Sequence, residues 1–146
     1  MVAVLAIRRP GADDVPAMAA QAAQLGYAVT PDELRARLHD LGRGNDAVVL
    51  VATGEGERTI GWIHVELKRT LLAPLSAQVM ALVVDERQRG GGVGAELLKA
   101  GEGWALEHRC HRMLVATRIT RERAHGFYRR EGYTLDKTSH IFEKEI

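Results

Sequence analysis

Residues 79–108 constrain the fold of this chain more than any other stretch. An apolar run at residues 79–84 is followed by the polar residues 85–89, and four glycines then fall within five positions before a helical pattern begins. Glycine has no Cβ, so such a loop leaves backbone N–H groups unshielded. The first turn of a helix adds unpaired N–H donors and partial positive charge. The order predicted here is therefore a strand, an anion-binding loop and a helix.

Hydrophobic periodicity elsewhere predicts more strands and helices around this unit. Thr30-Pro31-Asp32-Glu33 has the order of a helix start, with a cap, a first-turn proline and the glutamate of a capping box. Residues 47–52 and 59–68 are typical of an antiparallel hairpin. In the second of these strands, alternation places Trp62, His64 and Glu66 on one face and Ile63, Val65 and Leu67 on the other.

The predicted elements mix strands and helices along the whole chain, in the order β-α-α-β-β-β-α-β-α-β-β. They are a strand at 3–9, helices at about 13–25 (capped by Asp13 or Asp14) and 31–41, strands at 47–52, 59–68 and 77–84, a helix at 92–108, a strand at 113–117, a helix at about 121–130, and short strands at 133–135 and 139–144. Because a helix joins the strands at 77–84 and 113–117, we expect those two to be parallel. The fold class is α+β, with a mixed, mostly antiparallel sheet.

Length and composition exclude several classes of protein. With 146 residues we expect one domain spanning 1–146. The formal net charge of +1 gives no reason to expect a nucleic-acid partner, and no apolar stretch approaches the roughly 20 residues of a membrane span. The single cysteine, Cys110, excludes an intrachain disulfide framework and is typical of a reducing compartment, so we expect a cytoplasmic location. We expect Cys110 to be a spare thiol and not a nucleophile, and we expect no metal site.

The glycine loop alone leaves several interpretations open. A nucleotide-binding P-loop needs Gly-Lys-Ser/Thr after its spacer, whereas the chain continues Gly94-Ala95-Glu96. A dinucleotide-binding turn needs its glycines directly after the strand, and here residues 85–89 intervene. Arg118, after the next strand, would suit a 2′-phosphate and keeps an NADP-binding protein as an alternative. A glycine-rich turn that only caps a helix is the remaining structural alternative.

Two motifs in order resemble those of the GNAT acetyltransferases. Arg89-Gly90-Gly91-Gly92-Val93-Gly94 matches the acetyl-CoA loop of that family, Arg/Gln-x-x-Gly-x-Gly/Ala. Further along, residues 124–133 resemble the second motif, Ala-x-x-Phe-Tyr-x-x-x-Gly-Phe/Tyr. The predicted order of elements also resembles that of the family, including the paired early helices. The resemblance covers nearly the whole chain and implies a single-domain fold with parallel, splayed central strands.

By this resemblance, acetyl-CoA is the cofactor and the loop amides hold its pyrophosphate. The central strand is expected to bind the pantetheine arm through its backbone at a bulge, where it diverges from its parallel neighbour. A departure falls at Arg121, where many relatives carry asparagine, although its guanidinium would still reach the cofactor's phosphates. The expected cofactor-binding residues are Leu82, Val83, Val84, Arg89, Gly90, Gly91, Gly92, Val93, Gly94, Ala95, Arg121 and Tyr128.

The resemblance also implies the catalytic groups. Tyr128 aligns with a tyrosine that gives a proton to the departing thiolate. The attacking amine must be neutral, although an alkyl ammonium has a pKa of about 10. Relatives that use a glutamate base carry it before the glycine loop, where this chain has no competent base. His64 and Glu66, on the neighbouring strand, are the candidates, and a water chain to solvent is the alternative.

The implied function is acetyl transfer to a primary amine by direct attack in a ternary complex. We expect a small-molecule acceptor, such as an aminoglycoside-like or metabolite amine, bound by Tyr27, Trp62 and Gln78. The alternatives are a protein N-terminal or lysine acetyltransferase and a non-catalytic acyl-CoA sensor. No nucleic-acid or membrane partner is expected, and family members often form homodimers.

Overall fold

The computed structural model describes residue 4 and residues 6–146, which form two compact units. The first unit extends to Ala116 and contains a five-stranded sheet, and the second is Thr117–Ile146. The predicted strand at 3–9 is confirmed in part, as β1 (Ala6–Arg8), and residues 3 and 5 lie outside the described residues. Within the described residues, no helix has both the length and the apolar character to cross a bilayer.

The sheet has the order β1-β2-β3-β4-β5 and is mixed, as predicted. Antiparallel pairing joins β1 to β2 (Ala47–Thr53), β2 to β3 (Thr59–Lys68) and β3 to β4 (Ser76–Val84). Parallel pairing joins β4 to β5 (Met113–Val115) across the connecting helix α3 (Val93–Glu107). Both the hairpin and the parallel crossover are therefore confirmed.

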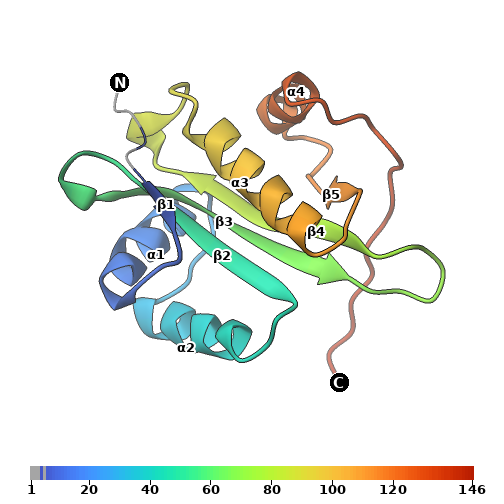
Figure 1. Ribbon diagram of the computed structural model, residues 1–146, viewed down its shortest axis with the longest axis horizontal. Coiled ribbons are helices and arrows are strands. Elements are labelled where there is room, and N and C mark those ends of the chain that lie inside the picture. The colour runs from blue at the N-terminus through green and yellow to red at the C-terminus, as the bar shows by residue number, and fades with distance from the viewer. Residues whose placement is uncertain (1–3, 5) are drawn as a thin grey trace. The chain divides into compact units, whose positions relative to one another are not determined.

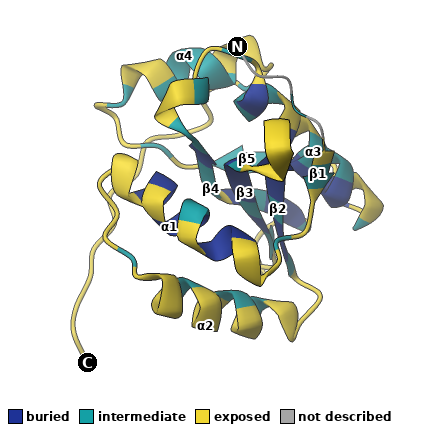
Figure 2. Cartoon of the chain, turned by 90° about the vertical axis from the view of Figure 1, so that its left-hand side faces the viewer, coloured by how far each residue is buried: buried dark blue, intermediate teal, exposed yellow. Residues whose placement is uncertain are grey.

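Two helices cover one face of the sheet and α3 covers the other (Figure 1). On the first face, α1 (Val15–Gln24) buries several residues, and α2 (Pro31–Gly42) lies beside it, in contact with β2, with no fully buried residue (Figure 2). The core cluster under these helices consists of Met18, Ala22, Val49, Val51, Trp62 and Val83. On the opposite face, the predicted apolar stripe of α3 is buried: Val93, Leu97, Gly101, Trp104 and Ala105.

The start of α2 follows the predicted capping box, and the start of α1 does not follow its prediction. Thr30 Oγ1 accepts from the Glu33 amide at 3.1 Å, and Glu33 accepts from the Thr30 amide at 3.0 Å. Neither Asp13 nor Asp14 caps α1 through its side chain. The Asp14 carboxylate is bound instead by Arg8, at 2.7 Å and 3.1 Å.

The predicted C-terminal strands at 133–135 and 139–144 are wrong. The second unit contains one helix, α4 (Glu122–Arg130), and no strand among its residues. The Tyr133 amide donates to the Tyr128 carbonyl at 2.9 Å, so it closes the end of α4 and is not available to a ladder. Residues 134–146 are exposed and lack the neighbouring strand that regular pairing requires.

Candidate functional site

The glycine loop leaves several backbone donors without acceptors. A short 3₁₀ turn, η3 (Glu86–Gln88), connects β4 to the loop, and the Gly91 amide donates to the Gln88 carbonyl at 3.3 Å. Among the described residues, the N–H groups of Arg89, Gly90 and 92–95 have no acceptor. The last four of these six belong to the N-cap and first turn of α3, whose first backbone bond runs from the Glu96 amide to the Gly92 carbonyl at 3.1 Å.

The backbone of this loop fits an anion. Gly90 and Gly92 have φ values of 83° and 87°, in the left-handed region where a Cβ is disfavoured. No atom lies within 4 Å of the position that a Cβ would occupy at either glycine, so the surface beside them is open. Arg89 adds an exposed guanidinium, whose Nε lies 3.4 Å from the Val84 carbonyl at the end of β4. Open space, free donors and positive charge together suit a phosphate or pyrophosphate.

The strand that leads into the loop is irregular, as predicted. Ala81 pairs with His64 and Val79 with Val65, which leaves Met80 as an extra residue on β4, a β-bulge. On its other side, β4 pairs with β5 only as far as Val79. Leu82, Val83 and Val84 therefore lie beyond the paired region, where an extended ligand could bind the free strand edge.

Four of the predicted site residues share the sheet face that α1 and α2 cover. Trp62, His64 and Glu66 alternate along β3, and Gln78 of β4 is the partner of Glu66. Trp62 is almost fully buried in the core cluster, and its indole nitrogen has no hydrogen-bond partner among the described residues. The predicted alternation on β3 is therefore confirmed, and it places these four side chains on the same face of the sheet.

His64 and Glu66 form a partly buried pair. The His64 Nε2 atom lies 3.7 Å from a carboxylate oxygen of Glu66, and the side chains are 19% and 39% exposed. Burial lowers the pKa of His64 below its usual 6.5, against the opposing effect of the Glu66 charge. The imidazole is consequently neutral at pH 7 and has the protonation state of a base.

The second unit contains Tyr128 and Arg121. Tyr128 lies in α4 and makes edge contacts with Phe127 and Tyr133, with ring centroids 5.1 Å and 5.6 Å apart. Burial raises the pKa of Tyr128 to about 12, so the phenol keeps its proton at neutral pH. Arg121 is the N-cap residue of α4 and does not cap it through its side chain.

One contact at the loop was not predicted from the sequence. The Gln24 side chain, at the end of α1, accepts a hydrogen bond from the Glu86 amide at 2.9 Å. The two residues are separated by 62 positions, and no local pattern indicates that they meet. Tyr27 follows shortly after Gln24 in the loop between α1 and α2, and is half exposed.

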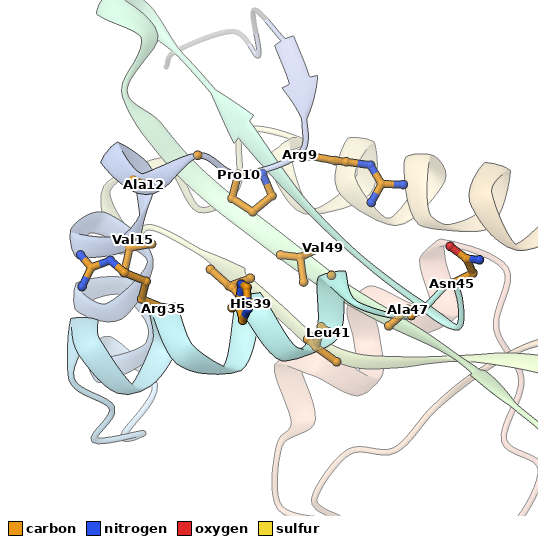
Figure 3. Close-up of a pocket in the computed structure, with 14 residues that line it drawn as sticks. Arg9, Pro10, Ala12, Val15, Arg35, His39, Leu41, Asn45, Ala47 and Val49 are labelled. Atoms are coloured by element: carbon orange, nitrogen blue, oxygen red, sulfur yellow. The ribbon is translucent and has the colours of Figure 1, made fainter.

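A cavity lies beside the strand residues that pair with His64 and Glu66, because Val49 and Ala47 of β2 line it and are the partners of these two residues. It measures about 420 Å³ and is bounded by α2, the segment after β1, and β2, with Pro10, Leu41 and Val49 on its walls (Figure 3). Arg35 lies at the left of the view and is paired with Asp32 at 2.6 Å, and Arg9 lies in its upper middle. None of the predicted site residues lines it. Cys110 is buried, and burial raises the pKa of its thiol, so it lacks the features of a reactive nucleophile.

Comparisons with known proteins agree with the geometry of the loop. The family model described as "Acetyltransferase (GNAT) family" matches residues 16–133. An aminoglycoside N(6')-acetyltransferase type 1 from Stenotrophomonas maltophilia is 28% identical over 125 residues, which cover 81% of each chain.

Solved structures show the same fold. AAC(6')-Iy, in complex with the bisubstrate analogue CoA-S-monomethyl-acetylneamine, has a TM-score of 0.85 at 15% identity, covering 97% of this chain and 98% of that one. Glucosamine-6-phosphate N-acetyltransferase from Arabidopsis thaliana has a TM-score of 0.80 at 18% identity, covering 96% and 98%. The chain thus belongs to the GNAT acetyltransferase family and is an N-acetyltransferase that depends on acetyl-CoA.

Proposed function

We propose that this protein acetylates a primary amine of a small molecule by direct attack in a ternary complex. The observation that carries the proposal is the set of free N–H groups in residues 89–95, which fits the pyrophosphate of acetyl-CoA. Acetyl-CoA supplies an activated thioester when bound. The family match spans residues on both sides of Ala116, which supports one domain over 1–146.

The cofactor contacts follow from the strand and the loop. Residues 89–95 would bind the pyrophosphate, with the Arg89 charge beside it. Leu82, Val83 and Val84 would bind the pantetheine arm through the unpaired edge of β4, beyond the last β5 partner at Val79. Arg121 would contribute a further positive charge toward a phosphate.

Two neutral groups would move the protons. His64 would take the proton of the attacking amine, directly or through water, and Glu66 would stabilise the resulting imidazolium from 3.7 Å. As the C–N bond forms and the C–S bond breaks, the Tyr128 phenol would donate to the departing sulfur. The Tyr128 pKa of about 12 exceeds the thiol value of about 8.5, so full transfer of the phenol proton is uphill and we expect Tyr128 to stabilise the departing sulfur through a hydrogen bond.

A small and weakly charged amine suits the acceptor side best. Tyr27 and Gln78 would line it, whereas Trp62, which was also predicted to bind the acceptor, is buried in the core cluster. A polycation would favour free carboxylates nearby, but Asp32 and Glu33 of α2 are paired with arginines of the same helix, at 2.6 Å and 3.6 Å. The similarity to an aminoglycoside acetyltransferase supports the small-molecule class more than that individual substrate.

We also propose a cytoplasmic homodimer. The buried, reduced Cys110 suits a reducing compartment. Exposed apolar side chains near the C-terminus, Leu135, Ile141 and Phe142, support association between copies. Sedimentation of the purified protein tests the dimer directly.

A thiol-release assay tests the function. The protein would be mixed with acetyl-CoA and a panel of aminoglycosides, amino sugars, polyamines and peptides with free N-termini or lysines. We expect CoA release that requires a small amine. Release with peptides alone would instead identify a protein acetyltransferase, and tight acetyl-CoA binding without release from any amine would identify a sensor.

A further inference from the structure

The end of α1 is bonded to the start of the glycine loop. Gln24 is the last residue of this helix, and its Oε1 atom accepts from the Glu86 N–H at 2.9 Å. The helix end itself is well fixed, because the Tyr27 amide donates to the Ala22 carbonyl at 3.1 Å and Gly26 has a left-handed φ of 89°. The acceptor oxygen of Gln24 therefore extends from a helix end whose backbone is closed by hydrogen bonds.

The remaining hydrogen bonds of the loop are local. Asp85 accepts from the Arg87 amide at 3.1 Å through its side chain and from the Gln88 amide at 2.8 Å through its carbonyl. The Gly91 amide then donates back to Gln88. Within the described part of the chain, the bond from Glu86 to Gln24 is the hydrogen bond that ties residues 86–95 to an element outside β4 and α3.

We propose that Gln24 is a positioning residue for acetyl-CoA, which holds the η3 turn so that the following free N–H groups face the pyrophosphate together. The inference rests on the proposed function of the loop. Gln24 and Glu86 are both exposed, so water can replace their bond at little cost to stability. The bond favours binding because it orders the loop beforehand, which reduces the conformational entropy that the loop loses when the cofactor binds.

Three variants isolate this contact. Gln24→Met keeps the length of the side chain without the acceptor, Gln24→Glu keeps an oxygen acceptor, and Ala23→Met places the same apolar side chain on the neighbouring exposed position of α1. The readouts are acetyl-CoA affinity by calorimetry, the turnover number at saturating acetyl-CoA, and the thermal unfolding midpoint, in a buffer whose salt screens the added charge of glutamate.

We expect Gln24→Met to weaken acetyl-CoA binding about fivefold, the effect of one hydrogen bond of about 1 kcal/mol. Saturated turnover and the unfolding midpoint should stay near those of the parent protein, Gln24→Glu should restore affinity, and Ala23→Met should match the parent. Unchanged affinity in Gln24→Met, or equal weakening in Gln24→Glu, would overturn the proposal. If the parent protein itself fails to bind acetyl-CoA, the proposed function of the loop fails instead.

Discussion

His64 and Tyr128 have pKa shifts of opposite direction with the same cause. Burial disfavours the charged form of each group, so it lowers the pKa of the imidazole and raises that of the phenol to about 12. At neutral pH both side chains are uncharged, and one is an acceptor while the other is a donor. This is the combination that amine acetylation needs, since one proton leaves the nucleophile and one is required by the leaving thiolate.

His64→Gln tests the base. Because the pKa of His64 is depressed, the reactive neutral form is lost only as pH falls below 6.5, so we expect kcat/KM to fall on that acid limb. The variant should lose about 10²-fold or more in kcat and should lack this limb. Measurement of kcat/KM from pH 5 to pH 9 with one amine checks both. A variant that keeps rate and profile would transfer the role to Glu66 or to solvent, and Glu66→Gln then separates these two.

Tyr128→Phe tests the donor to sulfur. It removes the phenolic oxygen and keeps the ring, so the edge contacts with Phe127 and Tyr133 should persist. We expect kcat to fall about 10²-fold while acetyl-CoA affinity changes little. Steady-state kinetics and calorimetry on the same preparation provide the comparison. Affinity lost in proportion to rate would show a structural role.

Asp14 is the most strongly perturbed carboxylate outside the site. The Arg8 guanidinium, the Gly11 amide and the Thr59 hydroxyl all donate to it, and together they hold its pKa at about 2 despite burial. The group is charged in the fold above its unfolded pKa of 3.8, so its stabilisation is present there and is lost as pH falls toward 2.

Asp14→Asn should therefore lower the free energy of unfolding by about 2 kcal/mol at pH 7, with a smaller difference near pH 2. Urea denaturation at several pH values measures this. Asp13→Asn, at the exposed neighbouring position, is the matched control and should change little. A difference between Asp14→Asn and the parent that does not shrink on acidification would exclude the carboxylate charge as its source.

At the scale of elements, α3 depends on close contact with β3. A Cβ at Gly101 would lie 3.0 Å from Val65 Cγ2 and 3.1 Å from Ile63 Cδ1, on the face opposite His64. These distances are shorter than ordinary contacts, so the Val65 and Ile63 side chains would have to shift by a few tenths of an ångström to admit a methyl group. This close packing positions α3, and with it the free N–H groups of its first turn, relative to the sheet.

Two alanine substitutions on α3 should have opposite signs. Gly101→Ala inserts a methyl into the packed interface and should destabilise by about 1–3 kcal/mol. Gly103→Ala adds the same methyl where no atom lies within 4 Å, and helix propensity should then stabilise by about 0.5–1 kcal/mol. Thermal or urea unfolding of the two variants measures both effects. A gain in stability for Gly101→Ala would contradict the close contact between α3 and β3 at this position.

Sequence patterns predicted the elements whose signals are local. The capping box of α2, the buried stripe of α3 and the loop between β4 and α3 each depend on residues a few positions apart, and each is found as expected. The prediction of strands at 133–135 and 139–144 was wrong because a strand needs a pairing partner, and the pattern of apolar residues does not specify that partner. The bond between Gln24 and Glu86 was missed for the same reason, since only the packed fold brings them together.

At the scale of the whole molecule, the residues proposed to bind the pyrophosphate and the pantetheine arm all lie in the first unit. Residues 82–84 and 89–95 belong to the first unit, whereas Arg121 and Tyr128 belong to the second. A ligand that binds the folded state and not the unfolded state raises the free energy of unfolding. Acetyl-CoA is therefore a probe of the fold as well as of the site.

Acetyl-CoA at about 100 times its dissociation constant should add about 2.7 kcal/mol to the free energy of unfolding. For a chain of this length that corresponds to a rise of roughly 5–10 °C in the unfolding midpoint, which a thermal-shift assay measures readily. NADPH at the same concentration is the matched control, because it also carries a pyrophosphate and an adenosine but places a nicotinamide where the pantetheine arm would meet the free edge of β4. Stabilisation by acetyl-CoA and not by NADPH would show that the strand edge contributes along with the loop. Equal shifts would mean that the loop alone recognises a pyrophosphate, and a shift with NADPH alone would contradict the assignment of residues 82–84 to the pantetheine arm.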